Sequence, residues 1–199
     1  MEVDAFQFAV RRHVRDWMEF FASKKVAHTS TQTRWETPPQ DCVKINVDAS
    51  FNASLGHRGW GMICIDSESD IKFLAAGSAD DVSDALHAET ISLSHVVQLA
   101  DQLGVGRVIF ETDSLNLQQA VTSNSYDFAP LGQMFRDIKA KLNSQFISTS
   151  VVHVSRDCNM PSHVLAARGA GLANAEMRLW LDNIPADVTR YVTSISAVS

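Results

Sequence analysis

The fold of this chain is decided by the stretch Lys44-Ile45-Asn46-Val47-Asp48-Ala49-Ser50-Phe51. Apolar side chains take every second position, which is the period of a β-strand. Asp48 falls on the opposite face. Because further apolar runs follow closely, the strand is predicted to be central, where an isolated carboxylate would be costly to desolvate. Asp48 therefore predicts a metal ion or a basic side chain beside it, unless the second face is open to water and Asp48 is an ordinary surface acid.

Length and composition favour one globular domain with a full core and an appendage, because the chain has 199 residues and 45% of them are hydrophobic. No apolar run is long enough to predict a membrane span, and the start of the chain has no hydrophobic signal core. We therefore expect a protein of the cytoplasm or nucleus that has no membrane partner. The three cysteines lack CxxC spacing, which argues against a disulfide framework or a structural zinc site.

Four segments are expected along the chain. Residues 1–27 have apolar side chains at helical spacing, which predicts an amphipathic helix. This helix would dock on the domain that follows, on a protein partner or on a second copy of the chain. Residues 28–41 are rich in Thr, Ser, Gln and Pro and predict a linker. Residues 42–175 form the main domain, and residues 176–199 form a tail to which we assign no structure.

The order of the elements within the main domain indicates an α/β fold. Three strands joined by short turns predict an antiparallel meander, and strands then alternate with helices. Ser114 is placed to cap the helix that follows the fourth strand. The strands are predicted at residues 44–51, 58–66, 71–79, 107–112 and 146–154, and the helices at 82–103 and from about residues 115, 130 and 160.

Three carboxylates stand on separate elements at positions where a charge is costly. Asp48 lies in the first strand. Glu89 follows Leu86 by three residues and so falls on the core-facing side of its helix. Asp113 follows the fourth strand, at the carboxyl end where sites of open α/β sheets form. Such a set is typical of a site for hard divalent cations such as Mg²⁺.

Several motifs support a family resemblance in combination. They are Trp35 with Pro38-Pro39, Lys44-Ile45-Asn46-Val47-Asp48, Arg58-Gly59-Trp60-Gly61, Ala88-Glu89, Glu111-Thr112-Asp113-Ser114, His153-Val154-Ser155-Arg156 with Asn159, and His163-Val164-Leu165-Ala166. With these motifs the chain resembles a ribonuclease H domain over about residues 35–190. The similarity is to the plant reverse-transcriptase-like form found in non-LTR retroelements and their stand-alone descendants.

The resemblance implies a ribonuclease H-like fold, with a five-stranded mixed sheet in the order 3-2-1-4-5 flanked by helices. It also implies hydrolysis of the RNA strand of RNA/DNA hybrids by two metal ions, Mg²⁺ or Mn²⁺. Asp48 would bridge both ions, and Glu89 and Asp113 would each hold one. His163 stands where the broad family has a fourth acid, and Asp157 is a possible substitute for it. A neutral imidazole binds Mg²⁺ poorly and Mn²⁺ better.

Two functions of different classes follow. The first is a metal-dependent ribonuclease H-type nuclease with Asp48, Glu89, Asp113 and His163 in its site. The second is a catalytically weak or inactive module that keeps the fold and binds nucleic acid or protein. The intact set of three carboxylates favours the enzyme. The replaced fourth acid and the net charge of −6 favour the module, because proteins that grip phosphates usually show a basic surface.

Overall fold

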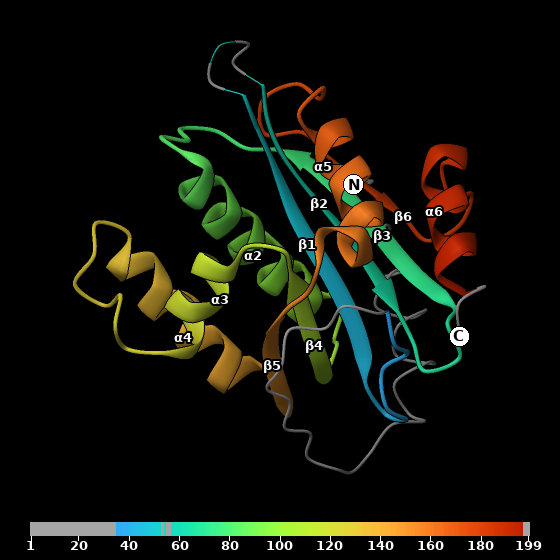
Figure 1. Ribbon diagram of the computed structural model, residues 1–199, viewed down its shortest axis with the longest axis horizontal. Coiled ribbons are helices and arrows are strands. Elements are labelled where there is room, and N and C mark those ends of the chain that lie inside the picture. The colour runs from blue at the N-terminus through green and yellow to red at the C-terminus, as the bar shows by residue number, and fades with distance from the viewer. Residues whose placement is uncertain (1–34, 53, 55–56, 197–199) are drawn as a thin grey trace, which may run out of the picture.

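The computed structural model describes residues 35–52, 54 and 57–196. Strands β1 (Val43–Asn52), β2 (His57–Ile65) and β3 (Ile71–Ser78) form the predicted antiparallel meander. Strands β4 (Arg107–Thr112) and β5 (Ser148–His153) run parallel to β1 on its other side (Figure 1). The helix expected within residues 1–27 lies outside the described residues, so its docking on the domain or on a partner stays a prediction.

The sheet has six strands in the order β5-β4-β1-β2-β3-β6. The predicted order of five strands is confirmed. The sixth strand, β6 (Met177–Trp180), comes from the segment that the sequence analysis left as a tail, and it pairs antiparallel with β3. The same segment continues into helix α6 (Ala186–Ser196). The sequence pattern gave no sign of β6, because a four-residue edge strand is defined by its hydrogen bonds to a neighbour rather than by alternation.

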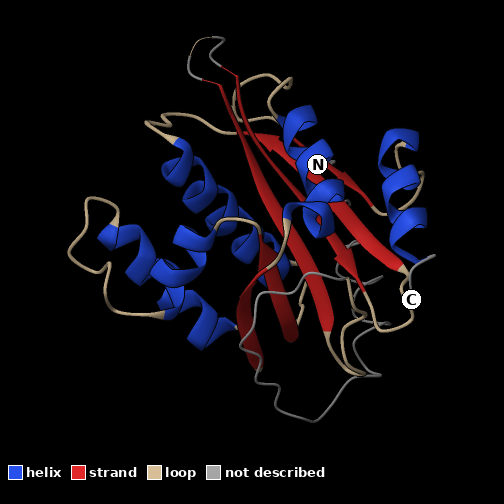
Figure 2. Ribbon diagram, viewed as in Figure 1, coloured by secondary structure: helices blue, strands red, loops and turns tan. Residues whose placement is uncertain are grey.

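Helices cover both faces of the sheet, and Figure 2 shows the two layers. Helices α2 (Ala85–Gln102), α3 (Leu115–Thr122) and α4 (Gly132–Gln145) lie on one face. The short 3-10 helix η1 (Arg156–Asn159) and helix α5 (Met160–Gly169) lie on the other. Among the described residues, no helix is both long enough and apolar enough to cross a membrane.

Strand β1 is buried on both faces. Val43, Ile45 and Val47 belong to the large core beneath α2, as their alternation predicts. The opposite face is also closed to water, since Asp48 has an exposed fraction of only 2% and Asn46 of 1%. Asp48 is therefore not an ordinary surface acid. Of the two alternatives, the burial of its carboxylate favours the one in which a metal ion or a basic side chain lies beside it.

Two side-chain caps fix where the helices near Asp48 and Asp113 begin. Helix α2 starts three residues later than predicted, because the Asp84 carboxylate accepts a hydrogen bond of 2.9 Å from the backbone N–H of His87. Ser114 caps α3 as predicted, accepting from the N–H of Leu117 at 3.3 Å. The second cap stands directly after Asp113 and so fixes the turn that carries this acid.

Helix α5 lies directly on the backbone of β2 because the strand offers glycines at the contact. A Cβ atom added to Gly61 would lie 2.2 Å from the backbone N of Ala166, and one added to Gly59 would lie 2.1 Å from that of Ala170. Both distances are far below van der Waals contact. The glycines therefore decide how closely the start of α5, with Asn159 and His163, approaches β1.

We predict that Gly61→Ala lowers the free energy of unfolding by about 1–3 kcal/mol, because the new methyl group must push the α5 backbone away from β2. Urea denaturation measures this loss. Gly171→Ala is the matched control, since the nearest atom to its added Cβ is the carbonyl oxygen of Arg168 at 3.4 Å, an ordinary contact. Equal stability of the two variants would contradict the close packing of α5 on β2.

Candidate metal centre

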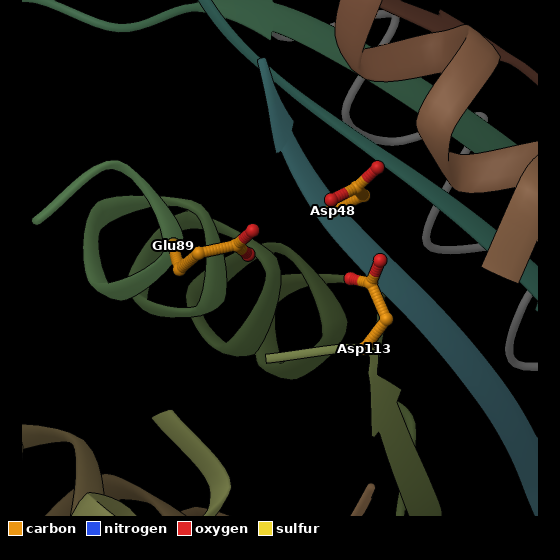
Figure 3. Close-up of side chains that lie close together, drawn as sticks. All are labelled: Asp48, Glu89 and Asp113. Carbon is orange, nitrogen blue, oxygen red and sulfur yellow. The ribbon is translucent and has the colours of Figure 1, made fainter. Parts of the chain in front are cut away.

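The three predicted acids come together where β1 and β4 part. The parallel pairing of these strands ends at Asn46 and Glu111, just before Asp48 and Asp113. Beyond this point β1 stays paired with β2, whereas β4 ends in the turn that leads to α3. Glu89 enters from the first turns of α2. Figure 3 shows the three carboxylates pointing toward one another from these elements.

The carboxylates form a compact acidic cluster of Asp48, Glu89 and Asp113. Each offers one oxygen, and these oxygens all lie within 4.8 Å of one another. Burial raises the pKa of Asp48 to about 6, and the negative charge of Asp113 adds to the shift while His163 opposes it. Burial raises the pKa of Glu89 well above its usual range, and Asp48 and Asp113 raise it further. Ionising the whole cluster is therefore unfavourable unless positive charge is supplied.

The donor set of the cluster fits a divalent cation. Carboxylate oxygens are the ligands that hard divalent cations prefer. The Oε2 atom of Glu89 is buried and has no hydrogen-bond partner, although buried polar atoms in folded proteins are normally satisfied. A cation held by Asp48, Glu89 and Asp113 would satisfy this oxygen and would also relieve the repulsion among the three carboxylates.

The two residues considered for the fourth ligand lie in different surroundings. His163, in the first turns of α5, places Nδ1 2.7 Å from Oδ2 of Asp48, and its side chain is 34% exposed. It touches the acidic cluster from the α5 side, without belonging to the group of mutually close ligand atoms. Asp157 lies exposed in η1 and also falls outside that group in the described part of the chain.

Arg156 is a residue of the site that the sequence analysis did not assign to it. Its Nη2 lies 3.2 Å from Nε2 of His163, and its Nη1 lies 3.9 Å from Oδ2 of Asp113. The guanidinium is 64% exposed and so brings a positive charge to the open side of the acidic cluster. Arg156 belongs to a motif of the family resemblance, but only the turn of η1 aims its side chain at the acids.

Asn159 is the second residue that was missed. It is fully buried between β1 and the start of α5. Its Nδ2 donates to the carbonyl oxygen of Val47 at 3.0 Å and to Oδ1 of Asp113 at 3.3 Å. It thereby links the residue that precedes Asp48 to the second aspartate of the cluster. Asn159 belongs to a motif of the family resemblance, but no local sequence signal indicates these partners.

A buried ion pair lies below the acidic cluster, on the same face of the sheet. Nζ of Lys44 is 2.8 Å from Oε1 of Glu111, and both side chains are almost fully buried. Burial raises the pKa of Glu111, and the charge of Lys44 opposes this rise. Glu111 therefore lies on the same face of the sheet as the acidic cluster but pairs with Lys44 instead of joining the cluster.

Comparison with known proteins was made for both sequence and structure. A family profile described as reverse transcriptase-like matches residues 46–169. A search of curated proteins found no significant match.

Solved structures with this fold include RNase H1 from the halophilic archaeon Halobacterium salinarum, with a TM-score of 0.55 and 18% identity over 66% of this chain and 99% of that one. The N-terminal RNase H domain of a Mycobacterium tuberculosis protein has a TM-score of 0.57 and 19% identity over 65% of this chain and 96% of that one. LC11-RNase H1, isolated from compost and solved with an RNA/DNA hybrid, has a TM-score of 0.54 and 17% identity over 65% and 96%. At these identities the likeness shows a shared fold.

We predict that Asp48→Asn stabilises the metal-free protein at high pH. The pKa of Asp48 is raised, so its contribution to stability is present at low pH and is lost as the pH rises through about 6. The substitution removes the charge of Asp48 and keeps the size of its side chain. The free energy of unfolding of the variant should therefore exceed that of the wild type by up to about 3 kcal/mol at pH 8, and this gain should shrink toward pH 4. Urea denaturation in the presence of a chelator measures both values.

The control for this experiment is Glu68→Gln, which removes one negative charge at an exposed position outside the acidic cluster. A gain for Asp48→Asn that is no larger than that of the control, or one that grows toward low pH, would show that the carboxylates are not in electrostatic conflict.

Proposed function

Because the chain belongs to the reverse transcriptase-like family, we propose that it is a ribonuclease H-type nuclease that hydrolyses the RNA strand of RNA/DNA hybrids with the help of divalent cations. The observation that carries this proposal is the convergence of Asp48, Glu89 and Asp113 within 4.8 Å at the point where β1 and β4 part. The hybrid as substrate is supported by the shared fold with LC11-RNase H1, which was solved in complex with one.

The residues of the site have separate roles in this proposal. Asp48, Glu89 and Asp113 would hold the cations through their carboxylate oxygens. When bound, two divalent cations would supply positive charge to the attacking and leaving oxygens of the phosphodiester. Arg156 offers an exposed guanidinium beside Asp113, where it attracts the phosphate backbone of the substrate. The Asn159 amide holds Asp113 in place through its donated hydrogen bond.

His163 makes the identity of the metal part of the proposal. Its Nδ1 is directed at Asp48, so the fourth position supplies an imidazole instead of a carboxylate. A cation shared by Asp48 and His163 would have a nitrogen ligand, which suits Mn²⁺ better than Mg²⁺. We therefore expect both ions to support activity and Mn²⁺ to be the more effective.

One observation favours the second candidate function, a module that binds hybrids with little or no turnover. Both oxygens of Asp48 already have partners within the protein, because Oδ1 accepts from the N–H of Ala49 at 2.9 Å and Oδ2 contacts His163. A cation must compete with these partners. Cleavage and hybrid binding are therefore measured separately in the experiment below.

The origin and location of the protein form a smaller part of the proposal. The motifs around Asp48 and Asp113 resemble the plant form found in non-LTR retroelements and their stand-alone descendants, and we propose that the chain is related to this group. We place its activity in the cytoplasm or nucleus. Both statements rest on the sequence pattern.

We predict that the protein cleaves the RNA strand of an end-labelled RNA/DNA hybrid in Mg²⁺ or Mn²⁺, and that Asp48→Asn lowers the rate by about 100-fold or more, because it removes a charge that holds the cations. Asp70→Asn is the matched control, since it makes the same chemical change at an exposed position outside the acidic cluster. Absence of cleavage in a folded protein that still binds the hybrid would favour the binding module.

A second prediction concerns the fourth position. His163→Asp adds a carboxylate next to Asp48 and should raise the affinity for Mg²⁺ by about 10-fold, because affinity in oxygen-ligand sites rises with ligand charge. His163→Asn is the control, because asparagine has the size of aspartate without its charge. Isothermal titration calorimetry with Mg²⁺ measures both. An unchanged Mg²⁺ affinity for His163→Asp would place the cation away from α5.

A further inference from the structure

A continuous row of polar side chains, buried except for the half-buried Asp113 at its end, leads from the lower end of β1 to the acidic cluster. We call it the polar network, and it consists of Lys44, Glu111, Asn46, Asn159 and Asp113. The distances along it are 2.8 Å from Nζ to Oε1, 2.9 Å from Asn46 Nδ2 to Glu111 Oε2, 3.1 Å from Asn46 Nδ2 to Asn159 Oδ1, and 3.3 Å from Asn159 Nδ2 to Asp113 Oδ1.

The ion pair at the lower end of the polar network sets the direction of the hydrogen bonds above it. An ammonium group only donates, so the Lys44 end requires an acceptor at Glu111. A carboxylate facing Asn46 also accepts, and Asn46 must therefore present its NH₂ group. The same NH₂ group also donates to Asn159, so Asn159 must accept with its side-chain carbonyl oxygen. This leaves the NH₂ group of Asn159 for the atoms on its far side.

Those far-side atoms are both acceptors. Asn159 Nδ2 meets the carbonyl oxygen of Val47, the residue before Asp48, and Oδ1 of Asp113. If the Asn159 amide were reversed, its oxygen would face both acceptors in a site closed to water, and the two hydrogen bonds would become repulsions. Asn46, Glu111 and Asn159 are each at most 1% exposed, so solvent does not replace a lost partner.

We propose that Glu111, Asn46 and Asn159 are positioning residues, which fix the Asp113 carboxylate relative to Asp48 by forcing the Asn159 amide to donate toward the acidic cluster. The inference rests on the proposed function only in assigning Asp113 to a cation. Hydrogen bonds to a ligating carboxylate orient it and tune the metal affinity, and their loss typically costs about 10- to 100-fold in affinity or activity.

The test begins with Glu111→Gln, which keeps the size of the side chain and adds a donor. With Lys44 in place, the glutamine has two possible orientations. In the first its NH₂ group faces the Lys44 ammonium, and in the second its NH₂ group faces the NH₂ group of Asn46. Either orientation sets donor against donor. The charged ammonium opposes an NH₂ group more strongly than the neutral Asn46 amide does, so the second orientation is favoured, and it reverses Asn46 and then Asn159. We expect the affinity for Mn²⁺, measured by calorimetry, to fall by about 10- to 100-fold.

The rescue variant separates hydrogen-bond direction from the loss of the ion pair. In Lys44→Gln with Glu111→Gln, the carbonyl of residue 44 accepts from the amide of residue 111, whose own carbonyl accepts again from Asn46. The ion pair is still absent, yet the original direction is possible, and we expect the Mn²⁺ affinity to return to within about threefold of the wild type. Asn46→Ala, which breaks the polar network without opposing donors, serves as a second test of the loss should Glu111→Gln fold poorly.

A second readout is independent of metal and of activity. The side-chain amide signals of Asn159 in a ¹H–¹⁵N spectrum of the metal-free protein should shift in Glu111→Gln and return in the double variant. Arg168→Gln is the control for a broken ion pair elsewhere on α5, because Arg168 pairs with Asp187 at 2.7 Å, outside the polar network. It should leave both the Asn159 signals and the Mn²⁺ affinity unchanged.

The outcomes distinguish this inference from the proposed function. Wild-type Mn²⁺ affinity and wild-type Asn159 signals in Glu111→Gln would overturn the positioning role even if the protein cleaves hybrids. Failure of the double variant to recover would also overturn it, because direction would then not be the cause. If the wild type cleaves no hybrid, the proposed function fails, while the Asn159 signals still decide whether the polar network controls the amide.

Discussion

The central constraint of this structure is the repulsion among three carboxylates held where β1 and β4 separate. Burial raises the pKa of Asp48 and of Glu89, so the metal-free fold holds the acidic cluster against its electrostatic preference. The parallel pairing of the two strands must stop at Asn46 and Glu111 to make room for the acids, and α2 must begin close enough to bring Glu89 across. Because the three carboxylates repel one another, the fold favours a positive charge at the acidic cluster, either a bound cation or the Arg156 guanidinium.

The side of the sheet opposite α2 supports the acidic cluster through contacts of another kind. Glycines at 59 and 61 let the α5 backbone lie on β2 without intervening side chains. This close approach places His163 against Asp48 and buries Asn159 beside β1. Below them, Lys44 and Glu111 form an ion pair that replaces water in a closed face of the sheet. Packing and hydrogen bonding thus act together. Because α5 packs closely on β2 and excludes water, the buried polar side chains beneath it must form hydrogen bonds with one another.

The comparisons establish the family and the fold of the chain, whereas its proposed function depends on the acidic cluster. The reverse transcriptase-like profile covers the segment that holds all three acids, and the solved structures with this fold include several ribonucleases H. Two details of this chain differ from what the proposed activity favours: an imidazole at the fourth position and an acidic net charge. In the proposed function, these details would affect how strongly cations and hybrid bind, and so would separate a nuclease from a binding module.

The sequence by itself determined the first five strands, the Ser114 cap and the three acids, because alternation, capping residues and costly charges are local signals. The order of these strands in the sheet was implied by the family resemblance. The resemblance also marked His163 as the departure from the family pattern. Tertiary structure alone decided that β6 joins the sheet, that Asp157 stays exposed, and that Arg156 and Asn159 turn toward Asp113. The direction in which a loop side chain points depends on how closely α5 and β1 pack. That distance is set by glycines more than 90 residues away in the chain, a relation that no local pattern contains.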